Sequence, residues 1–158
     1  MNRLPGNPDD ARLEVFPNRN AHRNYWIELA YPEFSSLCPV TGQPDSAALE
    51  IQYVPGDVCV ETKSLKFYLA SFRNHAAFNE DIVNRILDDL CAACSPRRMA
   101  VKGKFSPRGG VQLTATASFP DAIRTDAIRT DAIRTDGGPG DGGPTVGGPG
   151  VGGPGDME

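Results

Sequence analysis

The end of the chain is a five-residue repeat that fits neither a helix nor a strand. Of the 158 residues, those after Pro120 read Asp-Ala-Ile-Arg-Thr three times, followed by variants of Asp-Gly-Gly-Pro-Gly and Val-Gly-Gly-Pro-Gly. A period of five matches neither the roughly 3.6 residues of a helical turn nor the alternation of a strand, so no face can be apolar throughout. Glycine and proline also keep the entropy of such a chain high. We therefore predict that residues 120–158 form a disordered, low-complexity tail.

The charges divide unevenly between this tail and the rest of the chain. Seven of the 20 acidic and three of the 16 basic residues lie in 120–158, so residues 1–119 hold 13 of each. A balanced domain argues against a general nucleic-acid-binding surface, and we expect no direct nucleic-acid partner. No apolar stretch follows Met1. We therefore predict no signal peptide and no membrane span, and we expect a cytoplasmic protein with reduced cysteines.

Hydrophobic periodicity predicts one α+β domain over residues 21–119, preceded by a polar N-terminal arm at 1–20. Alternation predicts strands at 24–31, 47–54, 98–105 and 111–118, and helical spacing predicts helices at 63–73 and 76–94. The order ββααββ indicates an antiparallel four-stranded sheet with two helices. Such a sheet has a thin core and exposed edges, for which oligomerisation is the usual remedy.

Cys38 opens a turn-rich segment that ends at Asp45 and contains two prolines and a glycine. These residues disfavour a helix or a central strand, so we expect a loop to present the thiol. A thiol needs activation to act as a nucleophile, and Asp45 is a candidate acid or base for that purpose. Spacing alone favours an unrelated loop cysteine and turn aspartate, so the catalytic interpretation depends on the rest of the chain.

Two further segments have residues that suit a nucleotide-like ligand. Lys63 and Lys66 fall one turn apart on a predicted helix, capped by Thr62 or Ser64, and suit an anionic cofactor. An ordinary solvated helix start explains them equally well. Glu80 could accept from two adjacent N–H groups of a guanine-like ring, or it could simply be favoured near a helix N-terminus.

Two other features have ordinary explanations. Cys91 and Cys94 form a lone CxxC without a second ligand pair, so we expect small residues on a buried helix face and no metal. The sequence also has a basic cluster that includes Lys102, Lys104 and Arg108. Solvated side chains on an edge strand are an ordinary explanation for it.

Four segments, in this order, resemble the 7-cyano-7-deazaguanine reductase family, the QueF-type nitrile reductases of queuosine biosynthesis. The resemblance runs from about residue 31 to residue 118 and rests on Ser36–Asp45, Glu61–Tyr68, Ser71–His75 and Gly103–Gly110. It implies a tunnelling fold (T-fold) that assembles into ring-shaped homo-oligomers, often decamers of two stacked pentamers, with active sites between subunits.

The resemblance also implies a reaction and the residues that carry it. Family members reduce the nitrile of 7-cyano-7-deazaguanine to 7-aminomethyl-7-deazaguanine with NADPH, through a covalent thioimidate. The nucleophilic cysteine falls on Cys38 and the acid/base aspartate on Asp45. The remaining predicted contacts are Glu80, Asn79, His75 and Glu61 for the substrate, and Lys63, Ser64, Lys66 and Arg108 for NADPH, with no metal.

One departure from the family pattern leaves alternatives open. The family usually has histidine immediately before the base-binding glutamate, where this chain has Asn79. Asparagine can hydrogen-bond to the substrate but cannot carry a proton near neutral pH, so we expect impaired rather than lost activity. One alternative is the related amidinotransferase that acts on the same nitrile in tRNA, although it lacks the NADPH segment. Another is a purine-binding T-fold oligomer without catalysis. A zinc-dependent cyclohydrolase of this fold is a weaker alternative, because it would need metal ligands that are missing around Cys38.

Overall fold

A computed structural model describes residues 4–121, and the repeat from residue 122 onward lies outside the described residues. The prediction of a disordered tail therefore falls almost wholly on residues that are not described. The elements are η1 (Pro8–Asp10), β1 (Val15–Pro17), β2 (Ile27–Leu37), β3 (Pro44–Val54), β4 (Val58–Val60), α1 (Thr62–Ser71), η2 (Phe72–Asn74), α2 (Asn79–Cys94), β5 (Arg98–Phe105) and β6 (Thr114–Phe119).

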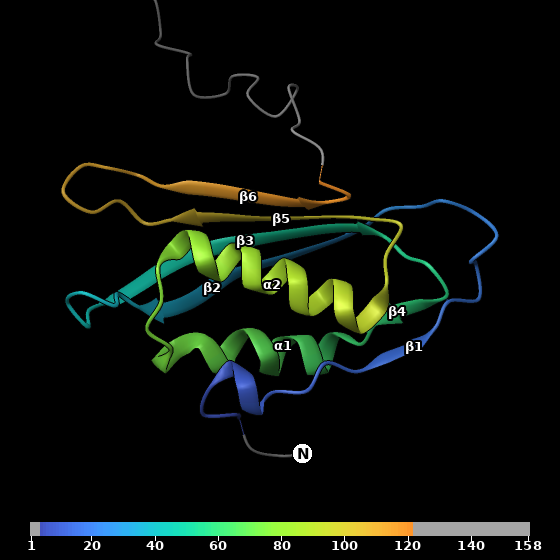
Figure 1. Ribbon diagram of the computed structural model, residues 1–158, viewed down its shortest axis with the longest axis horizontal. Helices are drawn as coiled ribbons and strands as arrows, with labels where there is room; N and C mark the ends of the chain where they lie inside the picture. Colours follow the sequence, from blue (N-terminus) through green and yellow to red (C-terminus); the bar gives the residue numbers. More distant parts are fainter. Residues whose placement is uncertain (1–3, 122–158) are drawn as a thin grey trace, which may run out of the picture. The chain divides into compact units, whose positions relative to one another are not determined.

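The predicted antiparallel sheet with two helices is confirmed. Four strands lie in the order β2-β3-β5-β6, and every neighbouring pair is antiparallel. Helices α1 and α2 lie on the same side of this sheet (Figure 1). No helix in the described part of the chain is long and apolar enough to cross a membrane.

A second, two-stranded sheet was not predicted. β1 pairs with β4 from Val15↔Val60 to Pro17↔Val58, so part of the expected N-terminal arm is hydrogen-bonded to the domain. Both strands have only three residues. A strand this short cannot show the alternation on which sequence-based prediction relies.

β2 is longer than predicted, and the extension decides where Cys38 lies. The strand continues beyond Tyr31 to Leu37, past Pro32, which falls at a register irregularity between Tyr31 and Phe34. β2 is an edge strand, and proline is tolerated at edges and bulges because no ladder hydrogen bond is lost there. β3 begins at Pro44, the first position of a strand, which proline also tolerates. The loop is therefore confined to residues 38–43.

The core forms where both helices press onto one face of the sheet. Along α2 the buried apolar residues recur at helical spacing, and they belong to one core cluster with alternating residues of β3 and β5. The largest buried side chains are Tyr53, Tyr68, Phe34, Phe72, Phe105, Leu49, Ile51, Ile82, Ile86 and Leu90.

The lone CxxC contributes to this core, largely as predicted. Cys94 is buried in the core cluster, Cys91 is half-buried, and both are free thiols. Burial raises the pKa of Cys94 to about 12, and it also raises that of Cys91. Both thiols are therefore protonated and unreactive at neutral pH.

Gly103 leaves the space into which α2 packs, and this gives a test of the fold. A Cβ at this position would lie 2.8 Å from Val83 Cγ2, 2.9 Å from Phe105 Cε2 and 3.3 Å from Leu49 Cδ2. We expect Gly103→Ala to lower the free energy of unfolding by about 1–3 kcal/mol, measured by urea denaturation, because overpacking forces neighbours from their positions. Gly6→Ala is the control, since nothing lies within 4 Å of its Cβ. Equal stability of the two variants would contradict this packing.

Candidate active site

Cys38 lies directly after β2, in the turn that joins it to β3. Its N–H donates to Gln43 O at 2.8 Å, and the N–H of Gly42 donates to Cys38 O at 2.9 Å. Gly42 has a φ of 68°, in the left-handed region that glycine adopts without strain. The turn therefore fixes the half-buried thiol at the end of a strand, rather than in a long mobile loop.

The surroundings of Cys38 favour its thiolate. The hydroxyl group of Thr41, together with the backbone N–H groups of Thr41 and Val40, hydrogen-bonds to the sulfur, and Arg108 adds a nearby positive charge. Against a small opposing effect of burial, these groups lower the pKa of Cys38 to about 7. About half of the thiol is then ionised at neutral pH, compared with a few per cent of an ordinary cysteine. Sequence reasoning missed Thr41. Its position in a turn, three residues after the cysteine, could have indicated that its hydroxyl group reaches the sulfur.

Asp45, the predicted acid/base residue, lies on β3 near Cys38. Asp45 is the register partner of Ser36 in the β2–β3 ladder, and its carboxylate is nearly buried. Arg108 Nε lies 2.7 Å from Asp45 Oδ1, and Arg108 Nη2 donates to Pro44 O at 2.7 Å. Arg108 was predicted to contact the cofactor, but in this structure its guanidinium group is engaged beside Cys38 and Asp45.

A short parallel bridge ties the start of α2 to the end of β2. Leu37 N donates to His75 O at 3.0 Å, and Ala77 N donates to Leu37 O at 3.2 Å. The segment that leads into α2 therefore runs beside the residue before Cys38. It places three predicted substrate residues, His75, Asn79 and Glu80, on the side of the domain that holds the thiol.

These three side chains differ in their surroundings. The ring of His75 packs edge-on against Phe72, with 5.6 Å between centroids. Asn79 is the first residue of α2, and its Oδ1 is buried without a hydrogen-bond partner in the described part of the chain. Glu80 follows in the first turn and is exposed to solvent, where a carboxylate is free to accept hydrogen bonds from a ligand.

The predicted cap of α1 was wrong. Glu61 is the N-cap, and its carboxylate accepts from Lys63 N at 2.8 Å and Ser64 N at 2.7 Å. These backbone hydrogen bonds lower the pKa of Glu61. The buried Ser64 donates its only hydroxyl hydrogen to Glu61 O at 2.8 Å and accepts from Glu14 N at 2.9 Å. Two predicted ligand contacts, Glu61 and Ser64, thus hold the start of the helix in this structure.

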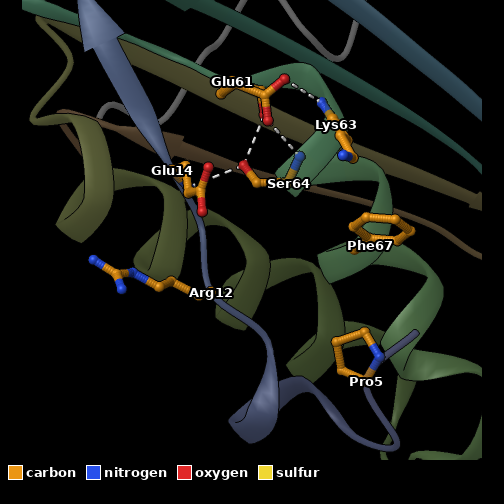
Figure 2. A pocket seen from close by; sticks show the side chains of 7 residues that line it. All are labelled: Pro5, Arg12, Glu14, Glu61, Lys63, Ser64 and Phe67. Atoms are coloured by element: carbon orange, nitrogen blue, oxygen red, sulfur yellow. Dashed lines mark hydrogen bonds between the residues drawn. The ribbon is translucent and has the colours of Figure 1, made fainter. Parts of the chain in front are cut away.

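A pocket of about 190 Å³ opens at this helix start (Figure 2). It is lined by Pro5, Arg12, Glu14, Glu61, Lys63, Ser64 and Phe67. Lys63 and Lys66 are exposed here, as predicted for cations that face solvent or a ligand. Sequence reasoning missed Arg12 and Glu14, because the segment before β1 shows no periodic signal.

The thiol and the start of α1 lie at opposite ends of the domain. α1 begins beside β4, whereas the β2–β3 turn and the start of α2 lie at the other end (Figure 1). The ten residues of α1 span about 15 Å. The structure therefore brings Cys38, Asp45 and Arg108 together, but it does not bring Lys63 or Lys66 to them within one chain.

Known proteins are similar to this chain in sequence and in fold. The family model described as QueF-like protein matches residues 44–122. A Desulfovibrio desulfuricans protein is 48% identical over 119 residues, which are 75% of this chain and 71% of that protein. A Chlorobaculum tepidum protein is 51% identical over 68% of this chain and 92% of its own length. This chain belongs to the QueF-like family.

Names and structures of relatives add detail to the family assignment. Both of these relatives, and a Bacillus pumilus protein 52% identical over 61% of its own length, are named NADPH-dependent 7-cyano-7-deazaguanine reductase. A crystal structure titled as the archaeosine synthase QueF-Like in the apo form matches with a TM-score of 0.56 and 24% identity. It covers 59% of this chain and 91% of that one, and it supports the fold alone.

Removing the Thr41 hydroxyl tests the origin of the thiolate. For the unaltered protein we expect the rate of Cys38 alkylation by iodoacetamide to rise with pH and to reach half its maximum near pH 7. In Thr41→Val this midpoint should move up toward the roughly 8.5 of a free thiol, because the thiolate loses its strongest hydrogen bond. Thr114→Val, at an exposed position of β6, is the matched control. An unchanged midpoint in Thr41→Val would show that another group stabilises the thiolate.

Proposed function

We propose that this chain catalyses the NADPH-dependent reduction of 7-cyano-7-deazaguanine to 7-aminomethyl-7-deazaguanine, a step of queuosine biosynthesis. The names of relatives about 50% identical support this activity. The observation that carries the proposal is the lowered pKa of Cys38, about 7, beside the ion pair of Asp45 and Arg108. An activated thiol next to a carboxylate is what nucleophilic attack on a nitrile requires.

In the proposed reaction Cys38 attacks the nitrile carbon to give a covalent thioimidate. Asp45 receives the thiol proton and delivers it to the nitrile nitrogen, while Arg108 holds one carboxylate oxygen at 2.7 Å. A nitrile accepts hydride poorly, and the thioimidate on Cys38 is a better acceptor. NADPH would supply two hydrides in succession, which take the substrate to the amine.

Substrate recognition is assigned to the first turn of α2. The exposed carboxylate of Glu80 can accept from adjacent N–H groups of the deazaguanine ring. Asn79 offers an amide oxygen that no group of the described chain occupies. His75, whose backbone carbonyl accepts from Leu37 N, is the third residue on this side. Glu61, the fourth predicted substrate contact, lies at the other end of the domain and would reach the substrate only across a subunit boundary.

The residues at the start of α1 fit the charge of NADPH. Lys63 and Arg12 line the pocket, Lys66 is an exposed cation one turn further along α1, and the phosphate groups of the cofactor are anionic. Within one chain this pocket lies away from Cys38. We therefore assign the cofactor pocket and the thiol of each active site to two different subunits. The T-fold ring, a decamer of two stacked pentamers, supplies such neighbours. β2 and β6 end the described sheet and are available to pair with them.

We place the reaction in the cytoplasm, with the catalytic domain over residues 21–119 and the arm at 1–20 attached to it through β1. The tail from 120 has no assigned role. The related amidinotransferase remains less well supported, because Glu61–Tyr68, the segment implied to bind NADPH, is present here.

Loss of the thiol is the direct test of this function. The protein should oxidise NADPH in the presence of 7-cyano-7-deazaguanine, and a mass spectrum with the nitrile alone should show an adduct on Cys38. Cys38→Ala should lose both the adduct and turnover, by at least about a thousandfold, because no other reactive thiol is available. Cys91→Ala should retain both, since that thiol is protonated by burial. Full activity of Cys38→Ala would refute the mechanism.

Asn79 provides a second test, because it is where this chain departs from its family. Asn79→His should raise the turnover rate several-fold if the family histidine relays a proton or orients the substrate. NADPH oxidation is the readout, and Asn84→His, an exposed site on the same helix, is the control. Tight binding of the substrate without turnover in either form would favour the alternative of a non-catalytic purine-binding oligomer.

A further inference from the structure

Two buried side-chain atoms lack a hydrogen-bond partner in the described part of the chain: Ser36 Oγ and Asn79 Oδ1. Leaving a polar group buried and unpaired costs stability, so each such group calls for an explanation. Both lie on the side of the domain that holds Cys38. Asn79 has an explanation as a predicted substrate contact, but Ser36 has no role in the mechanism derived so far.

Ser36 lies inside the site rather than on its rim. Its side chain is 0% exposed, and it precedes Cys38 by two residues on β2. Across the ladder its register partner is Asp45. Side chains of directly opposed residues in an antiparallel pair point to the same face, with Cβ atoms about 4.5–5.5 Å apart. A rotation about χ1 is therefore enough to bring the hydroxyl group to the carboxylate.

Asp45 pairs with the charged side chain of Arg108 and lies opposite Ser36 in the β2–β3 ladder. In this structure Asp45 Oδ1 bonds to Arg108, which comes from the β5–β6 turn and is partly exposed to solvent. Cys38 follows at the end of β2, and the backbone carbonyl of His75 accepts from Leu37 N. Among these groups only the Ser36 hydroxyl is both uncharged and without a partner.

We propose that Ser36 is a positioning residue for Asp45. The Ser36 hydroxyl group holds the Asp45 carboxyl group when it is neutral, whereas Arg108 holds it when it is charged. The proposal rests on the proposed reductase function. Arg108 attracts a carboxylate, and this attraction weakens once Asp45 has taken the proton of Cys38. The Ser36 hydroxyl then donates to Oδ1 and keeps the protonated Oδ2 directed toward the nitrile nitrogen.

The step balances without any further reagent. The Cys38 S–H proton passes to Asp45, the S–C bond forms as one C–N π bond breaks, and Asp45 returns the proton to nitrogen. The net change is addition of S–H across the nitrile to give the thioimidate. Ser36 keeps its own proton throughout, and Asp45 ends as the carboxylate that pairs again with Arg108.

The test is Ser36→Ala in the full chain, with Ser35→Ala as the matched control. Ser35 is the preceding residue of β2, and its register partner is Ser46 rather than Asp45. We expect the maximum rate of adduct formation with 7-cyano-7-deazaguanine to fall about tenfold in Ser36→Ala, with the half-saturating substrate concentration unchanged. The melting temperature should be unchanged or higher, because the deleted hydroxyl has no partner in the resting protein. Iodoacetamide should alkylate Cys38 at the unaltered rate, since that reaction needs no proton delivery by Asp45.

Each other outcome overturns the assignment. A normal adduct rate in Ser36→Ala shows that the hydroxyl does not act on Asp45. A slower rate together with a lower melting temperature, or an equal loss in Ser35→Ala, shows a structural role instead. Absence of any adduct and of NADPH oxidation in the unaltered protein refutes the reductase function itself, and with it this role. The unaltered protein therefore separates failure of the function from failure of the inference.

Discussion

The antiparallel pairing of β2 with β3 is the constraint on which the candidate site depends. Its register runs to Leu37↔Pro44 and closes with the hydrogen bond from Cys38 N to Gln43 O. Asp45 follows Cys38 by seven positions along the chain, but the tight turn places both at the same end of one ladder. The thiol, its carboxylate neighbour and the turn groups that stabilise the thiolate thus come from a single hairpin.

The second constraint is the attachment of α2 to that hairpin. The bridge between Leu37 and the segment before α2 fixes the start of the helix beside the thiol. Packing of α2 on β5, at the space left by Gly103, holds the rest of the helix against the sheet. Because α1 begins at the far end, the thiol and the start of α1 lie apart within one chain, which is the reason for proposing that they meet between subunits.

Much of the fold followed from periodicity. The two helices and the core strands β3 and β5 were predicted because their buried residues recur at regular spacing over eight residues or more. The prediction failed where a strand forms because of its pairing with another strand rather than because of a hydrophobic periodicity in its own sequence. β1 and β4 are too short to show alternation, and β2 continues past Pro32 only because it is an edge strand with an irregular register. The cap of α1 was misassigned because a glutamate reached two backbone amides that Thr62 and Ser64 had been expected to serve.

By itself, the sequence determined the class of fold and the residues that resemble those of a nitrile reductase. These depend on composition, periodicity and short motifs, which are local properties of a chain. Only the tertiary structure decided that Arg108 pairs with Asp45, that Thr41 lowers the pKa of Cys38, and that Ser36 is buried opposite Asp45 without a partner. Contacts such as that between Arg108 and Asp45 join residues far apart in the chain, and strand register, which no local pattern encodes, decides which side chains meet.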